Sequence, residues 1–183
     1  MAINLTVTLQ DIKKAQKATA AYAKKTPLYQ SIYLSTLCQA EIYLKLENLQ
    51  PTHSFKVRGV MNKLLNLTPL EKSKGVVTAS AGNHGQAVAF GAKELGFPVK
   101  VVVPTNTPQV KVDGIRRFGA ELLLYGANYP ESEAKAKQLS KEEERLYISP
   151  YNDRYIVAGH GTAGLEILEQ QPNIDVVVVP VGG

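Results

Sequence analysis

Cysteine and histidine are scarce in this sequence and tryptophan is missing, which excludes several kinds of site. The single cysteine among 183 residues cannot form an internal disulfide, so nothing requires an oxidising compartment. The three histidines, His53, His84 and His160, lie far apart and lack the spacing of metal ligands. We therefore expect no metal site.

Long apolar runs and basic runs are missing too. No segment approaches the roughly 18 apolar residues of a membrane-spanning helix, and the first residues do not have the pattern of a signal peptide. The formal net charge is +5, but it is spread along the chain without interleaved aromatic residues. We expect a cytoplasmic protein with no membrane or nucleic-acid partner, and the charge weakly indicates an anionic ligand.

The sequence does contain a regular alternation of apolar segments after Gly75. Short runs with strand character alternate with segments of helical length. Strands are expected at 76–78, 99–103, 121–124, 146–148 and 176–179, and helices near 83–95, 108–118, 131–143 and 160–170. This rhythm predicts an α/β fold with right-handed crossovers and a parallel sheet covered on both faces.

Lys56 lies near the start of a further predicted helix, after a turn-prone stretch. Thr52 or Ser54 is a candidate N-cap, because either side-chain oxygen can accept from a free backbone N–H. In the first turn of a helix the dipole disfavours a cation, which lowers the pKa of the amine and makes Lys56 a candidate nucleophile. Taken alone, a solvated surface lysine is the more common alternative.

A second candidate site follows the first of the predicted strands. Gly82 and Gly85 permit a tight turn, and the free N–H groups of the next helix form an anion site together with Ser80, Asn83 and His84. A carboxylate suits these neutral donors. The spacing is not that of a GxGxxG dinucleotide loop. A small-residue turn with an asparagine cap explains this segment equally well.

The sequence stops at Val181-Gly182-Gly183, directly after the strand expected at 176–179. A glycine turn at the carboxyl end of a buried strand often begins a phosphate-binding loop. Its position also predicts that the chain is a fragment of a longer protein. An activatable lysine, donors for a carboxylate and a glycine loop for a phosphate are together what a pyridoxal phosphate enzyme requires.

Four segments resemble one family. ENLQPTHSFKVRG, TASAGNHGQAVAF, IVAGHGTAGLEIL and VVVVPVGG are similar to motifs of the fold-type II pyridoxal phosphate enzymes, specifically threonine dehydratase (threonine ammonia-lyase) and its relatives. The likeness extends over the chain from about Leu9. KVDGIRRFGAELLLYGANYPESEAKAKQLS and His53 resemble the biosynthetic dehydratases in particular, which implies a place in isoleucine biosynthesis.

The resemblance implies a fold like that of the tryptophan synthase β subunit, with two parallel-sheet lobes. The large cofactor-binding lobe would comprise 1–70 plus 152–183 and be incomplete at its C-terminal end. The small, mobile lobe would comprise 71–151 and carry the loop for the substrate carboxylate. Relatives are dimers or tetramers, so a homo-oligomer is expected.

The resemblance also implies roles for individual residues in binding pyridoxal phosphate. Lys56 would hold the cofactor as a Schiff base and act as the catalytic residue. Phe55 would pack against a face of the cofactor ring, and Asn83 would hydrogen-bond its phenolic oxygen. Gly182 and Gly183 would begin the loop that binds the phosphate.

The substrate implied by the resemblance is a small amino acid. Ser80, Asn83 and His84 would hold its carboxylate, largely through backbone donors. The implied reaction converts L-threonine to 2-oxobutanoate and ammonia by α,β-elimination, with L-serine as a secondary substrate. Dehydration of serine or hydroxyaspartate stays open, because one missing methyl group discriminates only about 10- to 200-fold.

Two other reactions and one other class of protein are alternatives. Racemisation requires a second acid–base group on the opposite face of Cα. Serine racemase relatives carry a serine immediately before the Gly-Asn pair. This chain has Ala81 there, which cannot transfer a proton. β-Replacement enzymes typically follow that asparagine with threonine, where this chain has His84. From another class, the chain would be a truncated, non-catalytic fragment.

Overall fold

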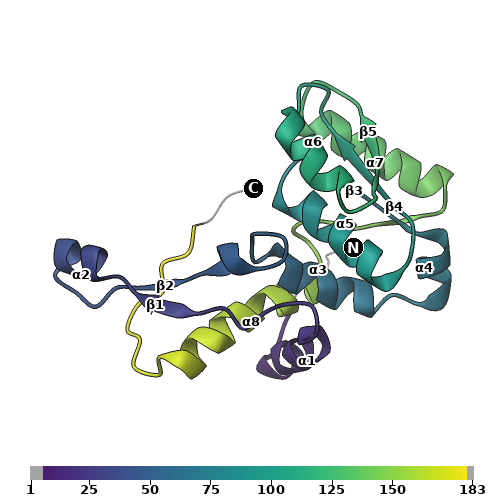
Figure 1. The fold of residues 1–183 in the computed structure, drawn as a ribbon. Helices are drawn as coiled ribbons and strands as arrows, with labels where there is room; N and C mark the ends of the chain where they lie inside the picture. The colour runs from purple at the N-terminus through teal and green to yellow at the C-terminus, as the bar shows by residue number, and fades with distance from the viewer. Residues whose placement is uncertain (1–5, 181–183) are drawn as a thin grey trace.

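The computed structural model describes residues 6–180, which form a sheet-containing lobe, a helical base and a projecting arm (Figure 1). The helical elements are α1 (Leu9–Thr19), α2 (Ile32–Cys38), the 3₁₀ helix η1 (Glu47–Leu49), α3 (Lys56–Leu65), α4 (Pro69–Lys74), α5 (Asn83–Leu95), α6 (Gln109–Arg116), α7 (Tyr129–Glu142) and α8 (Arg154–Gln170). The strands are β1 (Leu28–Gln30), β2 (Tyr43–Lys45), β3 (Val76–Ala79), β4 (Val99–Val103), β5 (Glu121–Leu124) and β6 (Leu146–Tyr147).

The lobe is organised around a four-stranded parallel sheet in the order β5-β4-β3-β6. The α/β class is confirmed, and four of the predicted strands form within a residue of the expected bounds. Alternate residues of each strand reach opposite faces, so Val101 packs into the core beside α5 while Val102 packs against α7. The sheet is therefore covered on both faces, as the alternation of predicted strands and helices indicated.

The helical base consists of α1, α3 and α8, with α3 also packing against α5 of the lobe. Gly159 of α8 lies so close to α3 that an added Cβ would be 2.5 Å from the carbonyl oxygen of Arg58 and 2.6 Å from Cα of Gly59. This close approach places the start of α3 against the middle of α8 and beside the sheet lobe.

One predicted strand does not form. Residues 176–179 are extended, but no backbone hydrogen bond in the described part of the chain joins them to a strand. Val176 is 73% exposed and Val178 is 89% exposed. A parallel strand needs neighbours that take up its N–H and C=O groups. Residues 176–178 line a pocket together with Leu28 and β2 of the arm, but in the described structure β1 and β2 pair with each other and not with 176–179.

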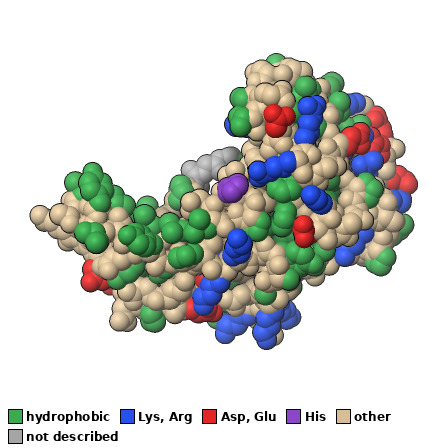
Figure 2. All heavy atoms as spheres, in the orientation of Figure 1, with side chains coloured by type: hydrophobic (Ala, Val, Ile, Leu, Met, Phe, Trp, Pro, Cys, Tyr) green, Lys and Arg blue, Asp and Glu red, His purple; other side chains and the backbone are tan. Residues whose placement is uncertain are grey.

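The arm formed by β1, α2 and β2 also exposes apolar side chains. Figure 2 shows them gathered on the arm, and they include Tyr29, Ile32, Tyr33 and Leu37, each more than half exposed. Over residues 6–180, no helix combines the length and hydropathy needed to cross a membrane.

Two helix starts differ from expectation. The helix predicted near 160–170 begins earlier, at Arg154, because the Asp153 side chain accepts from the N–H groups of Tyr155 and Ile156. Neither Thr52 nor Ser54 caps α3; its N-cap is Phe55, which makes no side-chain cap hydrogen bond. The hydroxyl oxygens of Thr52 and Ser54 are instead buried without a partner in the described structure.

Candidate active site

A pocket of about 270 Å³ lies where α3 meets the carboxyl ends of the parallel strands. Ser80 follows β3, Tyr129 comes after β5, and Tyr151 comes after β6. The residues that line it are Lys56, Ala79, Ser80, Ala81, Asn83, His84, Tyr129, Pro150 and Tyr151. The two sequence-predicted candidates, Lys56 and the loop 80–84, are thus brought together at the edge of the sheet where open α/β folds bind ligands.

Lys56 is the half-buried cation of this pocket. Its Nζ lies 5.0 Å from the centre of the Phe55 ring and 5.9 Å from that of Tyr151. Burial lowers the pKa of the Lys56 amine, because the charged form loses hydration. The direction agrees with the prediction from the sequence, and burial is a cause that the sequence did not show. A lysine with a lowered pKa is neutral more often and can act as a nucleophile or a base.

The loop 80–84 is built as a compact turn. The Ser80 hydroxyl accepts from the Gly82 N–H at 3.2 Å, and α5 begins at Asn83. Gly85 is required there, since a Cβ would lie 2.3 Å from the Ser80 carbonyl oxygen. The first N–H groups of α5 have no partner within the helix. They form an anion site on the pocket wall, consistent with a carboxylate ligand.

His84 is a neutral, buried member of this wall. Its side chain is only 3% exposed, and its Nε2 lies 3.3 Å from the carbonyl oxygen of Ile148. Burial lowers the pKa of His84 to about 4, and the nearby charge of Lys56 acts in the same direction. At neutral pH the imidazole therefore bears no charge and can donate to Ile148 while Nδ1 keeps its lone pair.

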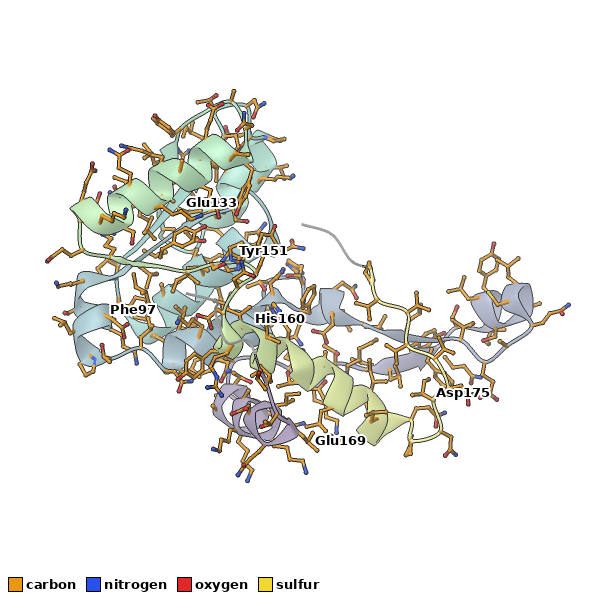
Figure 3. All side chains as sticks on the ribbon, turned by 180° about the vertical axis from the view of Figure 1, so that it is seen from behind. Phe97, Glu133, Tyr151, His160, Glu169 and Asp175 are labelled. Atoms are coloured by element: carbon orange, nitrogen blue, oxygen red, sulfur yellow. The ribbon has the colours of Figure 1, made fainter. Side chains whose placement is uncertain are left out.

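His160 supports the same site from α8, and Figure 3 shows it below Tyr151 between the lobe and the base. The rings of His160 and Phe55 meet edge to face with their centres 4.7 Å apart. Burial and the charge of Lys56 lower the pKa of His160 to about 3. The helix predicted near 160–170 would begin at His160, but α8 begins at Arg154, so His160 lies inside the helix.

The pocket also contains a residue that sequence reasoning missed. The Tyr129 hydroxyl donates to Glu133 at 3.3 Å, and the Tyr147 hydroxyl donates to the same carboxylate at 3.1 Å. Burial and the Glu133 charge raise the pKa of Tyr129 to about 12. The sequence signal that could have identified Tyr129 was its position at the start of a helix that follows a parallel strand.

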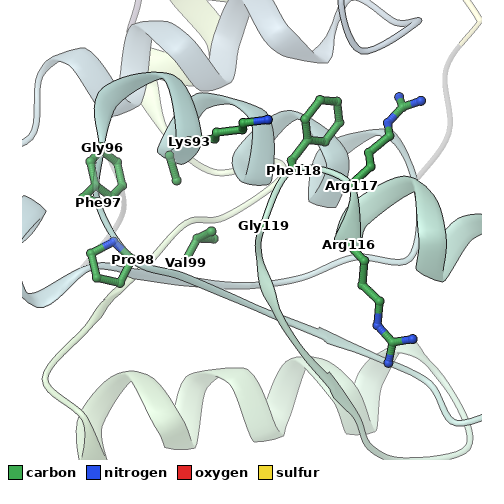
Figure 4. A pocket seen from close by; sticks show the side chains of 10 residues that line it. Lys93, Gly96, Phe97, Pro98, Val99, Arg116, Arg117, Phe118 and Gly119 are labelled. Carbon is green, nitrogen blue, oxygen red and sulfur yellow. The ribbon is translucent and has the colours of Figure 1, made fainter.

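A larger cavity, of about 560 Å³, lies away from these residues (Figure 4). It is lined by Phe97 and Phe118 and by the cations Lys93, Arg116 and Arg117. Lys93 and Arg116 are in the last turns of α5 and α6, where a cation stabilises the helix dipole. The helix dipoles account for Lys93 and Arg116, and Lys56 lines the smaller pocket, so we assign the chemistry to the smaller pocket.

Residues 20–183 match the family described as pyridoxal-phosphate dependent enzyme. The chain belongs to this family. The catabolic L-threonine dehydratase of Staphylococcus aureus is 43% identical over 178 residues, which are 97% of this chain and 51% of that protein. This chain therefore spans about half the length of the curated relatives it matches.

Solved structures of a racemase and a deaminase have the same fold. Maize serine racemase superposes with a TM-score of 0.89 at 36% identity, over 92% of this chain and 51% of that one. Threonine deaminase isoform 2 from Solanum lycopersicum superposes with a TM-score of 0.83, also at 36% identity, over 92% and 48%. The fold-type II assignment made from the sequence motifs is thereby confirmed.

The described residues fit the cofactor of this family. A lysine with a lowered pKa faces the pocket, and the half-exposed Phe55 ring lies beside its amine. Ser54, two residues before Lys56, and His84 in the pocket wall each have a buried polar atom without a hydrogen-bond partner in the described structure. The predicted phosphate-loop residues Gly182 and Gly183 lie outside the described residues.

Proposed function

We propose that this protein catalyses the pyridoxal phosphate-dependent conversion of L-threonine to 2-oxobutanoate and ammonia. The observation that carries the proposal is that Lys56 and the anion-binding start of α5 line one pocket. A small amino acid fits this arrangement, since its carboxylate can lie on the N–H groups while its Cα faces the amine. The names of the relatives, threonine dehydratase and threonine deaminase, support threonine as the substrate.

Lys56 acts on the Cα proton in this proposal. When bound, pyridoxal phosphate supplies an electron sink for the negative charge that develops at Cα. The neutral amine of Lys56, favoured by its lowered pKa, takes the Cα proton. The resulting ammonium can donate a proton to the departing β-hydroxyl group. Net loss of water and later hydrolysis of the nitrogen-bearing product yield the keto acid and ammonia.

Other residues of the chain hold the reactants. The Ser80 hydroxyl and the backbone N–H groups of Asn83 and His84 bind the substrate carboxylate, and neutral His84 adds no competing charge. Phe55 packs against the cofactor ring and Asn83 binds its phenolic oxygen.

The remaining cofactor and lobe assignments complete this proposal. Gly182 and Gly183 begin the phosphate loop. Segments 1–70 and 152–183 form the cofactor lobe, and segment 71–151 forms the lobe that carries the substrate loop. A cytoplasmic location, assembly as a dimer or tetramer and a place in isoleucine biosynthesis are parts of the same proposal that rest on the sequence resemblance.

Ala81 favours elimination over racemisation. Its methyl group lines the pocket and cannot transfer a proton. Racemisation needs one acid–base on each face of Cα, and Lys56 serves one face only. The same pocket accepts L-serine as a secondary substrate, because serine differs from threonine by one methyl group.

The test is an assay of 2-oxobutanoate formed from L-threonine by the complete protein loaded with pyridoxal phosphate. Lys56→Ala should lower kcat about 100- to 10,000-fold, the range expected for loss of an acid–base group. Lys63→Ala is the matched control. Lys63 is on the same helix, but its Nζ is ion-paired with Asp153 at 2.7 Å. Wild-type turnover in Lys56→Ala would reject the proposal.

A further inference from the structure

Arg58, two residues after Lys56, is the most deeply buried cation near the site, at 1% exposure. Its guanidinium donates to two carboxylates at once. Nε and Nη2 donate to the Glu47 oxygens at 2.8 and 2.7 Å, and Nη1 and Nη2 donate to the Glu166 oxygens at 2.7 and 2.8 Å. Nη1 also donates to the Thr162 hydroxyl at 3.2 Å. This is a bidentate contact to each of two elements, η1 and α8.

A second cation balances the charge of this group. The Nζ of Lys45 donates to Glu166 at 2.7 Å and to the Thr26 carbonyl oxygen at 2.8 Å. Two cations and two carboxylates therefore form a neutral network. Glu47 accepts a further hydrogen bond from the Thr26 hydroxyl at 2.6 Å. Each carboxylate has several donors, which is the condition under which buried charges are tolerated.

This network anchors the first turn of α3, which has no side-chain cap. No side chain caps the first turn of α3, and the hydroxyl oxygens of Thr52 and Ser54 have no partner in the described structure. Lys56 and Arg58 share that first turn. The contacts of Arg58 therefore tie the turn that carries Lys56 to η1 on one side and to α8 on the other.

Stability alone does not explain such a network. Replacing a buried ion pair by apolar residues of similar volume is often neutral or stabilising. What the network supplies is a defined geometry, because a planar guanidinium held by two carboxylates has one orientation. The nearby contact of Gly159 with the Arg58 carbonyl oxygen leaves α3 little freedom to shift.

We propose that Arg58 is a positioning residue whose contacts with Glu47 and Glu166 fix the direction in which Lys56 enters the pocket. This inference rests on the proposed function only in taking Lys56 as the lysine that binds pyridoxal phosphate. It assigns no chemistry to Arg58 itself.

The test measures Lys56 directly. The complete protein is mixed with pyridoxal phosphate and borohydride, so that the amine and the aldehyde condense with loss of water and hydride reduces the new bond. Peptide mass spectrometry then gives the labelling rate of Lys56, with Lys63 as an internal reference. Circular dichroism gives the unfolding midpoint of each variant, and labelling is done well below it.

Arg58→Lys keeps the charge but loses the planar fork. It should slow the labelling of Lys56 about 100-fold, the effect expected when a reacting group moves by roughly 1 Å. Glu47→Gln leaves the contact between Arg58 and Glu166 intact, so it should slow the labelling of Lys56 less than Arg58→Lys does. The control is Lys100→Gln, which breaks the ion pairs of Lys100 with Glu121 and Glu143 in the sheet lobe. This control should lower the midpoint and leave Lys56 labelling unchanged.

The outcomes separate the two proposals. Labelling of Lys56 at the wild-type rate in Arg58→Lys and in Glu47→Gln overturns the positioning role, whatever the midpoints. If Arg58→Lys does not fold, the labelling rate of Lys56 in Glu47→Gln alone tests the positioning role. Failure of the wild-type protein to label at Lys56 overturns the proposed function instead.

Discussion

The imidazole of His160 lies edge to face against the Phe55 ring, with ring centres 4.7 Å apart and planes inclined by 67°. The contact joins α8 to the residue that precedes Lys56. Such a pair contributes about 0.5–1.5 kcal/mol beyond the burial of its surface. Phe55 is 39% exposed, so part of its surface is open, and His160 supports its ring from α8.

Removing this support should weaken both the fold and the cofactor site. His160→Ala is expected to lower the free energy of unfolding by at least about 1 kcal/mol and to raise the Kd for pyridoxal phosphate. Urea unfolding and cofactor titration by absorbance measure the two effects. His53→Ala is the control, because His53 is exposed and makes no ring contact in the described structure. Equal behaviour of the two variants would show that the Phe55 contact is unimportant.

Acid should destabilise the protein below pH 6.5. The pKa values of His84 and His160 are lowered to about 4 and about 3 in the folded state, so the unfolded chain binds protons that the folded one does not. The stability that this difference contributes is complete above pH 6.5 and is lost as the pH falls toward 4. Between pH 7 and pH 5 the loss is about 2 kcal/mol for each histidine.

Urea unfolding at the two pH values measures this loss. In His160→Ala the difference between pH 7 and pH 5 should shrink by about half, because one of the two groups is gone. An unchanged difference in that variant would contradict a neutral, buried His160.

Two glycines of α8 should respond oppositely to alanine. A Cβ on Gly159 would lie 2.5 Å from the Arg58 carbonyl oxygen, and backbone cannot move aside cheaply. Gly159→Ala is expected to destabilise the fold by about 1–3 kcal/mol. Gly164, with no heavy atom within 4 Å of its ideal Cβ, should gain about 0.5–1 kcal/mol from the same change. Urea unfolding of both variants measures these effects. Equal changes in the free energy of unfolding would show that α3 and α8 do not approach each other closely at Gly159.

Ala81 should determine whether the pocket can racemise. With L-serine, Ala81→Ser is expected to produce D-serine slowly while the wild-type protein produces none, because the hydroxyl can serve the face of Cα opposite Lys56. Chiral chromatography of the amino acid pool measures it. The double variant that also has Lys56→Ala should form no D-serine. Formation of D-serine by the wild-type protein would contradict the assignment of Ala81.

The features that the sequence predicted well depend on local pattern. β4 forms at the expected residues because its four valines, interrupted only by Lys100, need a sheet that is covered on both faces to bury them. Lys56 and the loop 80–84 were both recognised from motifs, and their meeting in one pocket follows from the parallel sheet, whose strands end at a common edge.

The features that were missed depend on contacts between distant residues. Thr52 and Ser54 are adequate caps by residue type, but the backbone at Phe55 is already helical and leaves no cap position for them. Residues 176–179 have strand character, but a strand exists only where another strand pairs with it. The contact of His160 with Phe55 joins residues more than a hundred positions apart, and no local pattern indicates it.

Identifying the lysine that binds pyridoxal phosphate tests the central claim most directly. The complete protein is labelled with pyridoxal phosphate at limiting concentration, reduced with borohydride and digested, and every lysine is quantified by mass spectrometry. Lys56 should carry most of the label, because burial lowers its pKa and its amine faces the pocket. Addition of L-threonine before reduction should remove that label. Label spread evenly over surface lysines, or unaffected by L-threonine, would contradict the account.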